Sequence, residues 1–394
     1  MPDFREEAQT LRDQLIAWRR DLHRHPELAF EERRTAGLVA EHLKSLGLDV
    51  RTGVGKTGVI GLLEGARPGK TVMLRFDMDA LPVEEANEVE YASQIPGRMH
   101  ACGHDGHTAI GLGVATLLAR HRSVLHGRVK FVFQPAEEAI GGARAVIDDG
   151  ALEDPTPDVA FGLHLWNALP LGQAIVQAGP LMAAATHFQL IVQGRGGHGA
   201  RPHETRDPLV AAAHFVTAVQ TVVSRNIEPS QKVVLSVGTF HAGHAFNVIP
   251  DRAELGGTIR TLDDGVLARV EQRLQEIIEG IARAFDVRTE LQIRHAAPVL
   301  INDERAAAYV ARAARRVLGD GAVRSMEPLM VSEDMSEFLN RVPGCYFLMG
   351  SMNPDRGLDY PHHHPRFDFD EDALPLGVAI LAEATVIYLS EEVG

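Results

Sequence analysis

The stretch Met99-His100-Ala101-Cys102-Gly103-His104-Asp105-Gly106-His107 contains three histidines, one cysteine and one aspartate. Two glycines among them allow a tight backbone turn. The apolar run 108–118 follows and is typical of a buried helix, so the cluster is expected on a loop and at the head of that helix. Cysteine and histidine are the ligands that zinc and similar metals prefer. The stretch therefore predicts a metal site, although histidines that only make hydrogen bonds remain an alternative at this point.

Segments with the pattern of buried strands lead into further residues of the ligand type. They are Thr71–Phe76 before Asp77-Met78-Asp79, Val129–Phe133 before Gln134-Pro135-Ala136-Glu137-Glu138, and Asp158–Leu163 before His164. Because these strands alternate with helical segments, we expect an α/β domain with a mainly parallel sheet. In such sheets the functional site lies outside the carboxyl ends of the strands. The three groups of polar residues are therefore expected to meet at one edge of the sheet.

The pattern changes between about Ala183 and Ala296, where two β-α-β units of similar length follow one another. This order predicts an inserted α+β domain of the ferredoxin-like kind. We therefore expect a catalytic, metal-binding domain made of residues 1–182 and 297–394, interrupted by an inserted domain of residues 183–296. A histidine triplet, His362-His363-His364, precedes the final helical segment of the first domain.

Composition excludes several classes of protein. The 394 residues carry 39 Lys and Arg against 53 Asp and Glu, a net charge of −14, and contain no basic patch, so nucleic-acid binding is not expected. No run approaches 18 apolar residues and the charged N-terminus lacks a signal core, so no membrane partner is expected. Two cysteines, Cys102 and Cys345, do not make a disulfide framework, and a free metal-binding cysteine suits the reducing cytoplasm.

The number of ligand-type residues indicates more than one metal ion. One tetrahedral structural zinc needs four ligands, whereas this chain offers five positions. Two catalytic metals that share a bridging group would use all five, and the chemistry would also need a carboxylate that is not a ligand. The adjacent pair Glu137-Glu138 offers one carboxylate for each purpose. Taken alone, the pair could be surface, His164 a core histidine, and Cys102 an inert small hydrophobe. The five candidate ligand positions are Cys102, His104, Glu138, His164 and one histidine of 362–364.

Motifs spread along nearly the whole chain resemble the aminoacylase/carboxypeptidase family of co-catalytic metallopeptidases, and specifically its amidohydrolase branch. That branch includes hippurate hydrolases, indole-acetyl-amino-acid hydrolases and N-acetyl-diaminopimelate deacetylases. Besides the stretches already quoted, the motifs are Arg24-His25-Pro26-Glu27-Leu28, Arg75–Pro82, Gly162-Leu163-His164, Gly196–His203, Asn247-Val248-Ile249-Pro250-Asp251, Ser332-Glu333-Asp334 and His363-His364-Pro365-Arg366-Phe367-Asp368.

The resemblance implies a role for individual residues. His363 becomes the ligand of the triplet because the family ligand stands two residues before the proline, and Glu137 becomes the general base. Where the wider family has His-x-Asp, this chain has Asp77-Met78-Asp79, so Asp77 is not assigned as a ligand and Asp79 is expected to support one. The implied metal ligands are Cys102, His104, Glu138, His164 and His363.

The inserted domain then resembles the family's lid and dimerisation domain. In that role His198 would reach the partner subunit's site and stabilise the oxyanion. Asn247 and Arg260 would hold the substrate carboxylate. The resemblance therefore also implies a homodimer or a dimer of dimers on a zinc-peptidase-like fold.

The expected function is that of a metal-dependent amidohydrolase. It would use two divalent ions, zinc before manganese, cobalt or nickel, to cleave N-acyl amino acids. A metallocarboxypeptidase or dipeptidase acting on short peptides is the alternative. Two further rivals are a hydrolase with Cys102 as nucleophile and a non-catalytic metal or peptide binder. The first leaves Glu138, His164 and His363 unexplained, and the second leaves Glu137 without a role.

Overall fold

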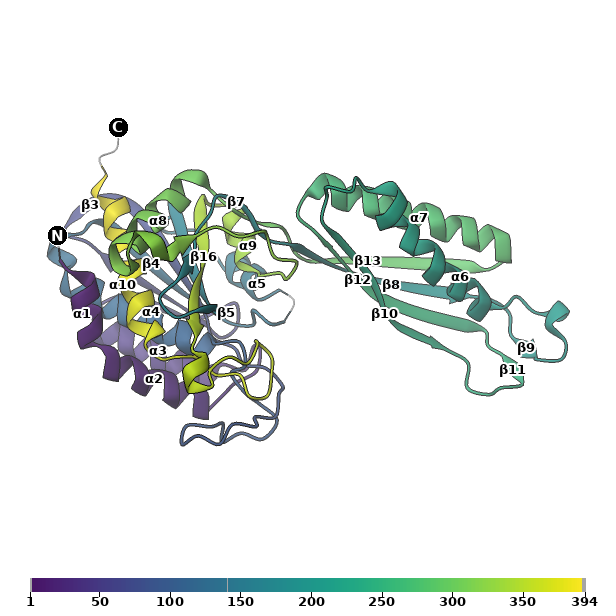
Figure 1. Cartoon of the computed structure of the whole chain (residues 1–394), viewed down its shortest axis with the longest axis horizontal. Coiled ribbons are helices and arrows are strands. Elements are labelled where there is room, and N and C mark those ends of the chain that lie inside the picture. Colours follow the sequence, from purple (N-terminus) through teal and green to yellow (C-terminus); the bar gives the residue numbers. More distant parts are fainter. Residues whose placement is uncertain (1, 140, 392–394) are drawn as a thin grey trace. The chain divides into compact units, whose positions relative to one another are not determined.

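A computed structural model describes residues 2–139 and 141–391, which separate into two compact units (Figure 1). The first unit comprises the described residues of Met1–Gly179, Ile301–Glu327 and Asp334–Gly394. The second comprises Pro180–Leu300 together with Pro328–Glu333. No sequence pattern indicated that the segment Pro328–Glu333 belongs to the second unit, which it joins through backbone hydrogen bonds between Leu329 and both Leu181 and Ala183.

The first unit is built on a sheet of eight strands in the order β1-β2-β4-β3-β5-β16-β6-β15. The central strands β4, β3, β5 and β16 run parallel, whereas β1 and β2 join their neighbours in antiparallel fashion. Strand β6 is antiparallel to β16 and parallel to β15. The predicted α/β fold with a mainly parallel sheet is thus correct. The strands are β1 (Asp49–Val54), β2 (Gly58–Glu64), β3 (Arg67–Asp77), β4 (His126–Gln134), β5 (Val159–Pro170), β6 (Ala174–Ile175), β15 (Val323–Arg324) and β16 (Gly344–Met352).

Helices cover both faces of this sheet. Helices α4 and α10 pack on one face, and the short helices α5 and α9 pack together on the other (Figure 1). The helices of the unit are α1 (Phe4–Thr10), α2 (Arg12–Arg24), α3 (Arg33–Ser45), α4 (His104–Arg120), α5 (Gly142–Asp148), α8 (Glu304–Leu318), α9 (Met335–Leu339) and α10 (Ala373–Ser390).

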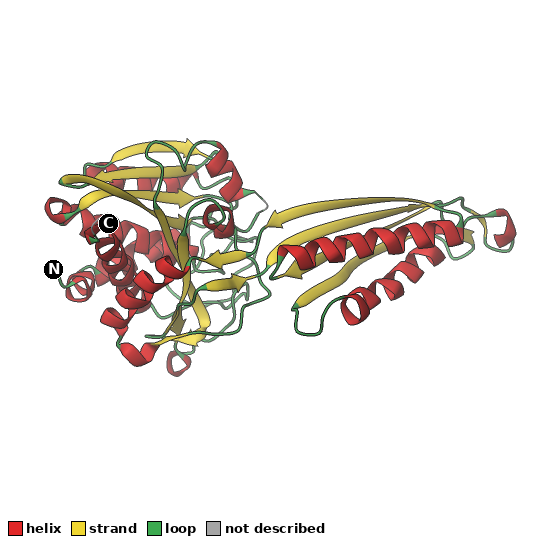
Figure 2. Ribbon diagram, turned by 90° about the horizontal axis from the view of Figure 1, so that it is seen from above, coloured by secondary structure: helices red, strands yellow, loops and turns green. Residues whose placement is uncertain are grey.

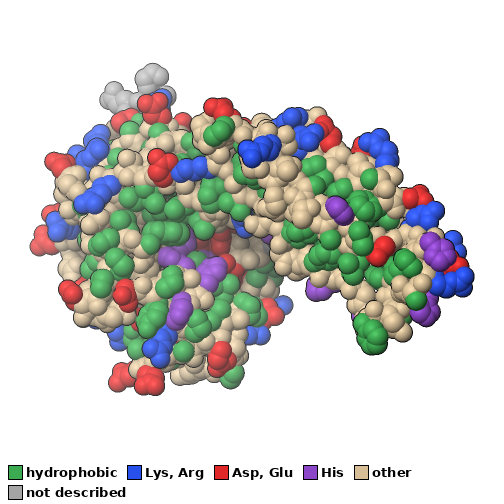
Figure 3. Space-filling model, turned by 45° about the vertical axis from the view of Figure 1, so that its right-hand side comes forward, with side chains coloured by type: hydrophobic (Ala, Val, Ile, Leu, Met, Phe, Trp, Pro, Cys, Tyr) green, Lys and Arg blue, Asp and Glu red, His purple; other side chains and the backbone are tan. Residues whose placement is uncertain are grey.

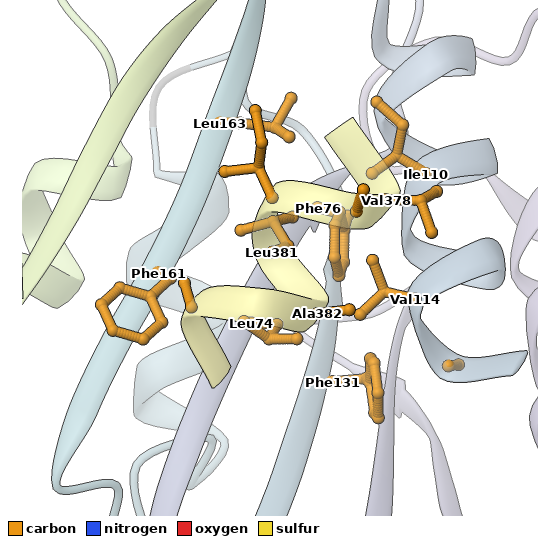
Figure 4. Packing of buried hydrophobic residues seen from close by; sticks show 14 of the residues in the cluster. Leu74, Phe76, Ile110, Val114, Phe131, Phe161, Leu163, Val378, Leu381 and Ala382 are labelled. Atoms are coloured by element: carbon orange, nitrogen blue, oxygen red, sulfur yellow. The ribbon is translucent and has the colours of Figure 1, made fainter. Parts of the chain in front are cut away.

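The core of the first unit lies between the sheet and helices α4 and α10. Figure 4 shows Ile110 and Val114 of α4 beside Val378 and Leu381 of α10, above the strands. Helix α4 approaches the sheet closely at Gly111, where an added Cβ would lie 2.7 Å from the ring of Phe133. This close packing fixes the head of α4 against the strand ends.

Helix α10 is the one described helix that is long and apolar enough to cross a membrane, by length and composition alone. However, 83% of its apolar window is buried inside the unit, as expected for a core helix. Its apolarity is therefore explained by the core.

The second unit is a four-stranded antiparallel sheet in the order β10-β12-β8-β13, with two long helices on one face (Figure 2). This is the predicted α+β arrangement. Its elements are β8 (Ala184–Gln193), β9 (Gly197–His198), α6 (Pro208–Thr221), β10 (Val233–Ala242), β11 (Val248–Ile249), β12 (Arg252–Thr261), α7 (Asp264–Phe285) and β13 (Arg288–Ala297). The short strands β7 (Gly179–Met182) and β14 (Leu300–Asn302) lie where the chain passes between the units.

Two expectations about element ends were wrong. The strand that was expected to stop at His164 continues as β5 to Pro170, because β16 pairs with it along most of that length. His164 therefore projects from within a strand rather than after it. At the N-terminus, apolar residues recur at steps of three and four and predict one helical face, but the helix is divided, with α1 ending at Thr10 and α2 starting at Arg12. These apolar residues are Phe4, Ala8, Leu11, Leu15, Trp18 and Leu22.

Candidate metal centre

Cys102 and His104 stand on either side of a left-handed turn at the head of α4. Gly103 has φ +89°, a conformation that side-chain-bearing residues rarely adopt, and His104 is the first residue of the helix. Sγ of Cys102 lies 3.5 Å from Nε2 of His164 on β5. Ligand atoms of Cys102, His104 and His164 all lie within 4.8 Å of one another. These three buried residues therefore form one candidate ligand group.

The ring orientation of both histidines suits metal binding. Nδ1 of His104 lies 2.9 Å from the carbonyl oxygen of Asp79, and Nδ1 of His164 lies 2.6 Å from that of Leu165. Each Nδ1 can thus donate to a carbonyl, which leaves Nε2 as the nitrogen with a lone pair. Within residues 2–139 and 141–391, Nε2 of His104 has no hydrogen-bond partner although it is buried. A cation would satisfy it.

The pair Glu137-Glu138 follows the end of β4 directly, as the sequence predicted. Their backbone N–H groups donate to the two carboxylate oxygens of Asp79, each at 3.0 Å. Oε1 of Glu138 lies 3.1 Å from Nε2 of His363, and these two residues form a second ligand group with Cys102. Oε2 of Glu137 lies 3.9 Å from Nε2 of His104. The carboxylate of Asp79 therefore holds the backbone of the loop that carries both glutamates.

The three histidines of the triplet have different surroundings. His363 faces Glu138, as just described. Nε2 of His362 lies 2.9 Å from the carbonyl oxygen of Leu165, and its ring stacks on Trp166. His364 stacks on Tyr360 outside the ligand groups. The geometry thus favours His363 as the ligand.

His107, the third histidine of the opening stretch, is engaged elsewhere. Its Nδ1 lies 2.6 Å from Oδ1 of Asp77, and its Nε2 accepts the N–H of Leu165 at 2.9 Å. Arg75 donates to the other oxygen of Asp77 at 2.6 Å. Asp77 and His107 lie close enough to His104 to form a further possible ligand group. However, the hydrogen bonds just described already engage the side chains of Asp77 and His107. Their hydrogen bonds instead connect the end of β3 to α4 and β5 next to the candidate ligands.

The centre carries an excess of negative charge. Burial opposes the charged form of His104, but Asp77, Asp79 and Glu138 outweigh it and raise the pKa of His104 to about 10. Burial, with Glu138 and Glu137, raises the pKa of the Cys102 thiol well above its ordinary value. Burial and neighbouring histidines keep the pKa of His164 well below its ordinary value. Such a site favours a divalent cation, which would displace the protons from both His104 and Cys102.

This electrostatic setting disfavours a cysteine nucleophile. A nucleophilic cysteine needs a lowered pKa, which a nearby cation or an imidazolium supplies. Here burial and the carboxylates of Glu138 and Glu137 raise the pKa of Cys102, although His104 with its own raised pKa belongs to the same ligand group, and the low pKa of His164 leaves that neighbour neutral. Cys102 is better suited to be a metal ligand.

The remaining sequence-predicted residues lie in the second unit. His198 and Asn247 are neighbours, because His198 on β9 pairs with Val248 on β11 and Gly199 N–H donates to the carbonyl of Asn247 at 2.8 Å. Nδ1 of His198 accepts the N–H of Ala200 at 3.0 Å, so the neutral ring carries its proton on Nε2. Arg260 on β12 donates to Oγ of Ser332 at 2.6 Å. No carboxylate partner of Arg260 lies within the described part of the chain.

The fold and the donor set together define a metal-dependent hydrolase. Thiol, imidazole and carboxylate groups meet here from the head of α4, the loop after β4, strand β5 and the histidine triplet. Among the described residues, the buried Nε2 of His104 makes no hydrogen bond, and a cation would satisfy it. On the surface of the first unit, histidine and acidic side chains gather in a hollowed area (Figure 3). The residues fit two divalent ions sharing a site.

Comparison with known proteins agrees with this class. Residues 73–386 match peptidase family M20/M25/M40. The chain is 40% identical to the N-acetyl-L-cysteine deacetylase of Bacillus subtilis, over 93% of this chain and 86% of that protein. It is 39% identical to thermostable carboxypeptidase 2 of Saccharolobus solfataricus, over 95% of both chains. The crystal structure of the YXEP protein of Bacillus subtilis, a dinuclear metal-binding peptidase, superposes with a TM-score of 0.83 at 34% identity, covering 97% of this chain and 99% of that one.

The chain therefore belongs to peptidase family M20/M25/M40. The resemblance drawn from the sequence motifs is confirmed, and so are the fold class and the assignment to metal-dependent amidohydrolases. Two divalent ions and a small-molecule substrate agree with the same relatives.

Glu32 supports the loop beside the centre, and sequence reasoning missed it. It lies on the loop before α3, fully buried, and accepts the N–H of Ala136 at 2.9 Å, directly before the two glutamates. Its nearest sequence signal is the motif ending at Leu28, and nothing in that motif indicates a contact with the loop after β4.

Proposed function

We propose that the protein hydrolyses the amide bond of N-acyl amino acids that carry a free carboxylate. The observation that carries this proposal is the Glu137-Glu138 pair. Glu138 faces a histidine of the ligand group, while Glu137 lies 3.9 Å from Nε2 of His104, within reach of a water molecule at the centre. A ligand and a neighbouring base are what metal-assisted amide hydrolysis requires.

The proposed ligands are Cys102, His104, Glu138, His164 and His363, with zinc as the preferred metal because thiolate and imidazole suit it. Bound divalent ions would supply Lewis acidity, which lowers the pKa of water toward about 7 and polarises the acyl carbonyl. Glu137 takes a proton from the attacking water and later delivers it to the nitrogen of the leaving amine. The products are a carboxylate and a free amino acid.

The second unit supplies the proposed substrate contacts. His198 holds its proton on Nε2, as a donor to the oxyanion of the tetrahedral intermediate must. Arg260 has a hydroxyl partner and no carboxylate partner in the part of the chain that the structure describes, so its charge is available to a substrate carboxylate, alongside Asn247. In this proposal His198 serves the centre of the partner subunit in a homodimer.

Two relatives favour two different substrate classes. One acts as an N-acetyl-L-cysteine deacetylase and the other as a carboxypeptidase. Hydrolysis of short peptides is therefore the second candidate function. Both cysteines of this chain are free and buried, which suits a reducing compartment, and we propose the cytoplasm.

A substrate panel tests the proposal. N-acetyl, N-benzoyl and N-indoleacetyl amino acids are compared with dipeptides and with N-acyl amino-acid amides that lack the free carboxylate. We expect the N-acyl amino acids to be cleaved best, with activity lost on chelation and restored by zinc or another divalent ion. Preference for dipeptides would favour the second candidate. Full activity after verified metal removal would exclude the metal-assisted reaction.

A further inference from the structure

The loop that carries Glu137 and Glu138 is held from inside the unit by two buried carboxylates. Three consecutive backbone N–H groups donate to them. That of Ala136 donates to Oε1 of Glu32 at 2.9 Å, and those of Glu137 and Glu138 donate to Asp79 at 3.0 Å each. Because these N–H groups donate to buried carboxylates, Glu32 and Asp79 hold in place the backbone that carries the side chains of Glu137 and Glu138.

The Glu32 carboxylate is itself fixed by other segments. Its Oε1 also accepts the N–H of Phe30 at 2.9 Å, and its Oε2 accepts the hydroxyl of Thr57 at 2.5 Å. The residue has no exposed surface. A buried carboxylate with every neighbour supplied by protein has little freedom to move. Glu32 therefore ties the loop after β4 to the start of α3 and to the turn before β2.

The bond to Ala136 acts at a strained point of the loop. Ala136 has φ +57°, in the left-handed region that residues other than glycine adopt at a cost. Its carbonyl is tightly packed as well, since a Cβ added at Gly142 would lie 2.2 Å from it. The backbone direction at Ala136 decides where the next side chain, that of Glu137, points. A strained turn persists only where its surroundings hold it, and Glu32 is the acceptor that does so here.

We infer that Glu32 is a positioning residue for the general base. Its carboxylate accepts hydrogen bonds from Phe30, Thr57 and Ala136, none of which is a proposed metal ligand, and it acts by fixing the backbone turn from which Glu137 projects. The inference rests on the proposed role of Glu137. Asp79 holds the N–H groups of both glutamates, but Ala136, which Glu32 holds, directly precedes Glu137 and is one residue further from Glu138. Loss of Glu32 should therefore disturb the base more than the metal ligand.

Glu27 offers a matched control for a structural effect. Like Glu32, it accepts two backbone N–H groups, those of Arg34 at 2.9 Å and Thr35 at 2.8 Å near the start of α3. Among the described residues, its side chain makes no hydrogen bond to the loop after β4. Glu27→Ala and Glu32→Ala should both lower the melting temperature. Only Glu32→Ala should lower kcat, by about 10–100-fold, with KM and metal content unchanged. Glu32→Gln should recover most of kcat, because one amide oxygen can accept both N–H groups.

A double-mutant cycle with Glu137→Gln separates positioning from general damage. If Glu32 acts through Glu137, Glu32→Ala should cause no further loss of kcat in the Glu137→Gln background. An equal loss in both backgrounds, a kcat equal to that of Glu27→Ala, or loss of metal would each overturn the inference. Should Glu32→Ala fail to fold, Glu32→Asp, which withdraws the carboxylate by one methylene, enters the same cycle. If Glu137→Gln alone keeps full activity, Glu137 is not the general base. The single variant therefore distinguishes failure of the proposed function from failure of the role of Glu32.

Discussion

Nε2 of His363 lies 3.1 Å from Oε1 of Glu138, and this contact joins the last histidine cluster of the chain to the loop after β4. Because both groups belong to one candidate ligand group with Cys102, removing either should empty a metal position. We expect His363→Ala and Glu138→Ala to bind metal at least about tenfold more weakly. Loss of a ligand should weaken metal binding at least as much as loss of a residue that supports a ligand. Metal content after dialysis, measured per chain by mass spectrometry, checks this.

The neighbouring His364 is the control for that experiment, since it stacks on Tyr360 away from the ligand groups. His364→Ala should keep the metal content of the wild type. Equal metal loss in the variants at 363 and 364 would mean that the whole segment, rather than one ligand, is responsible.

Glu137→Gln should retain metal and lose about 10²–10⁴-fold in kcat, because a positioned general base contributes roughly that factor. The amide keeps the shape of the side chain but cannot take the proton of water. Turnover measured beside metal content decides between the two glutamates. If Glu137→Gln loses metal while Glu138→Gln keeps it, the roles of the pair are reversed.

The two cysteines allow a test of whether the thiol of Cys102 is a metal ligand, with Cys345 as the control. Cys102 lies in two candidate ligand groups, whereas Cys345 is buried within β16 and belongs to no such group in the described chain. Cys102→Ala should weaken metal binding and activity together, and Cys345→Ala should keep both. If added metal restores full activity to Cys102→Ala, the thiol is dispensable as a ligand, and a nucleophilic role is excluded by the same result.

Sequence reasoning predicted the sheet because strand and helix patterns alternate, and it predicted the meeting of ligand-type residues because they follow buried strands. It named His104 rather than His107 as a ligand, although nothing in the local pattern separates the two. Both stand at the head of α4, and only the partners of each ring, the Asp79 carbonyl for one and Asp77 for the other, separate them. Those partners come from the end of β3, which is distant in sequence.

The role of Glu32 was equally invisible in the sequence. Its contact with Ala136 spans 104 positions and goes to a backbone N–H group, which carries no residue-specific signal. The continuation of β5 beyond His164 was missed for a related reason. Pairing with β16 extends that strand, and no local pattern reports such a distant partner.

His42 on α3 should make stability sensitive to acid. Burial lowers the pKa of His42, whose Nε2 lies 2.9 Å from the hydroxyl of Thr116. The folded protein therefore binds fewer protons than the unfolded chain below the ordinary histidine pKa of about 6.5, so stability falls as pH drops through that value. Replacing His42 by Gln removes this contribution. Between pH 8 and 5, the free energy of unfolding of the wild type should fall more steeply than that of His42→Gln, as urea unfolding would report. Parallel curves would mean that His42 titrates alike in both states.

The second unit is tested through His198 and Arg260. His198→Ala should cut kcat and leave metal content unchanged, because a donor to the oxyanion acts on charge that develops only in the transition state. Arg260→Ala should chiefly raise KM, because a substrate carboxylate is held alike in the ground and transition states. Steady-state kinetics with an N-acyl amino acid separate the two effects. A KM effect alone for His198→Ala would make it a binding residue.

Mixing two inactive variants tests whether His198 serves a partner subunit. In a homodimer of Glu137→Gln with His198→Ala, one of the two centres would combine an intact Glu137 from one chain with an intact His198 from the other. Activity should then recover toward about half of the wild-type value per mixed dimer, while each variant alone stays inactive. Subunit exchange is verified with two distinguishable tags before activity is measured. If exchange is complete and activity does not recover, each chain uses its own His198, because every mixed dimer would then contain one centre without the base and one without the donor.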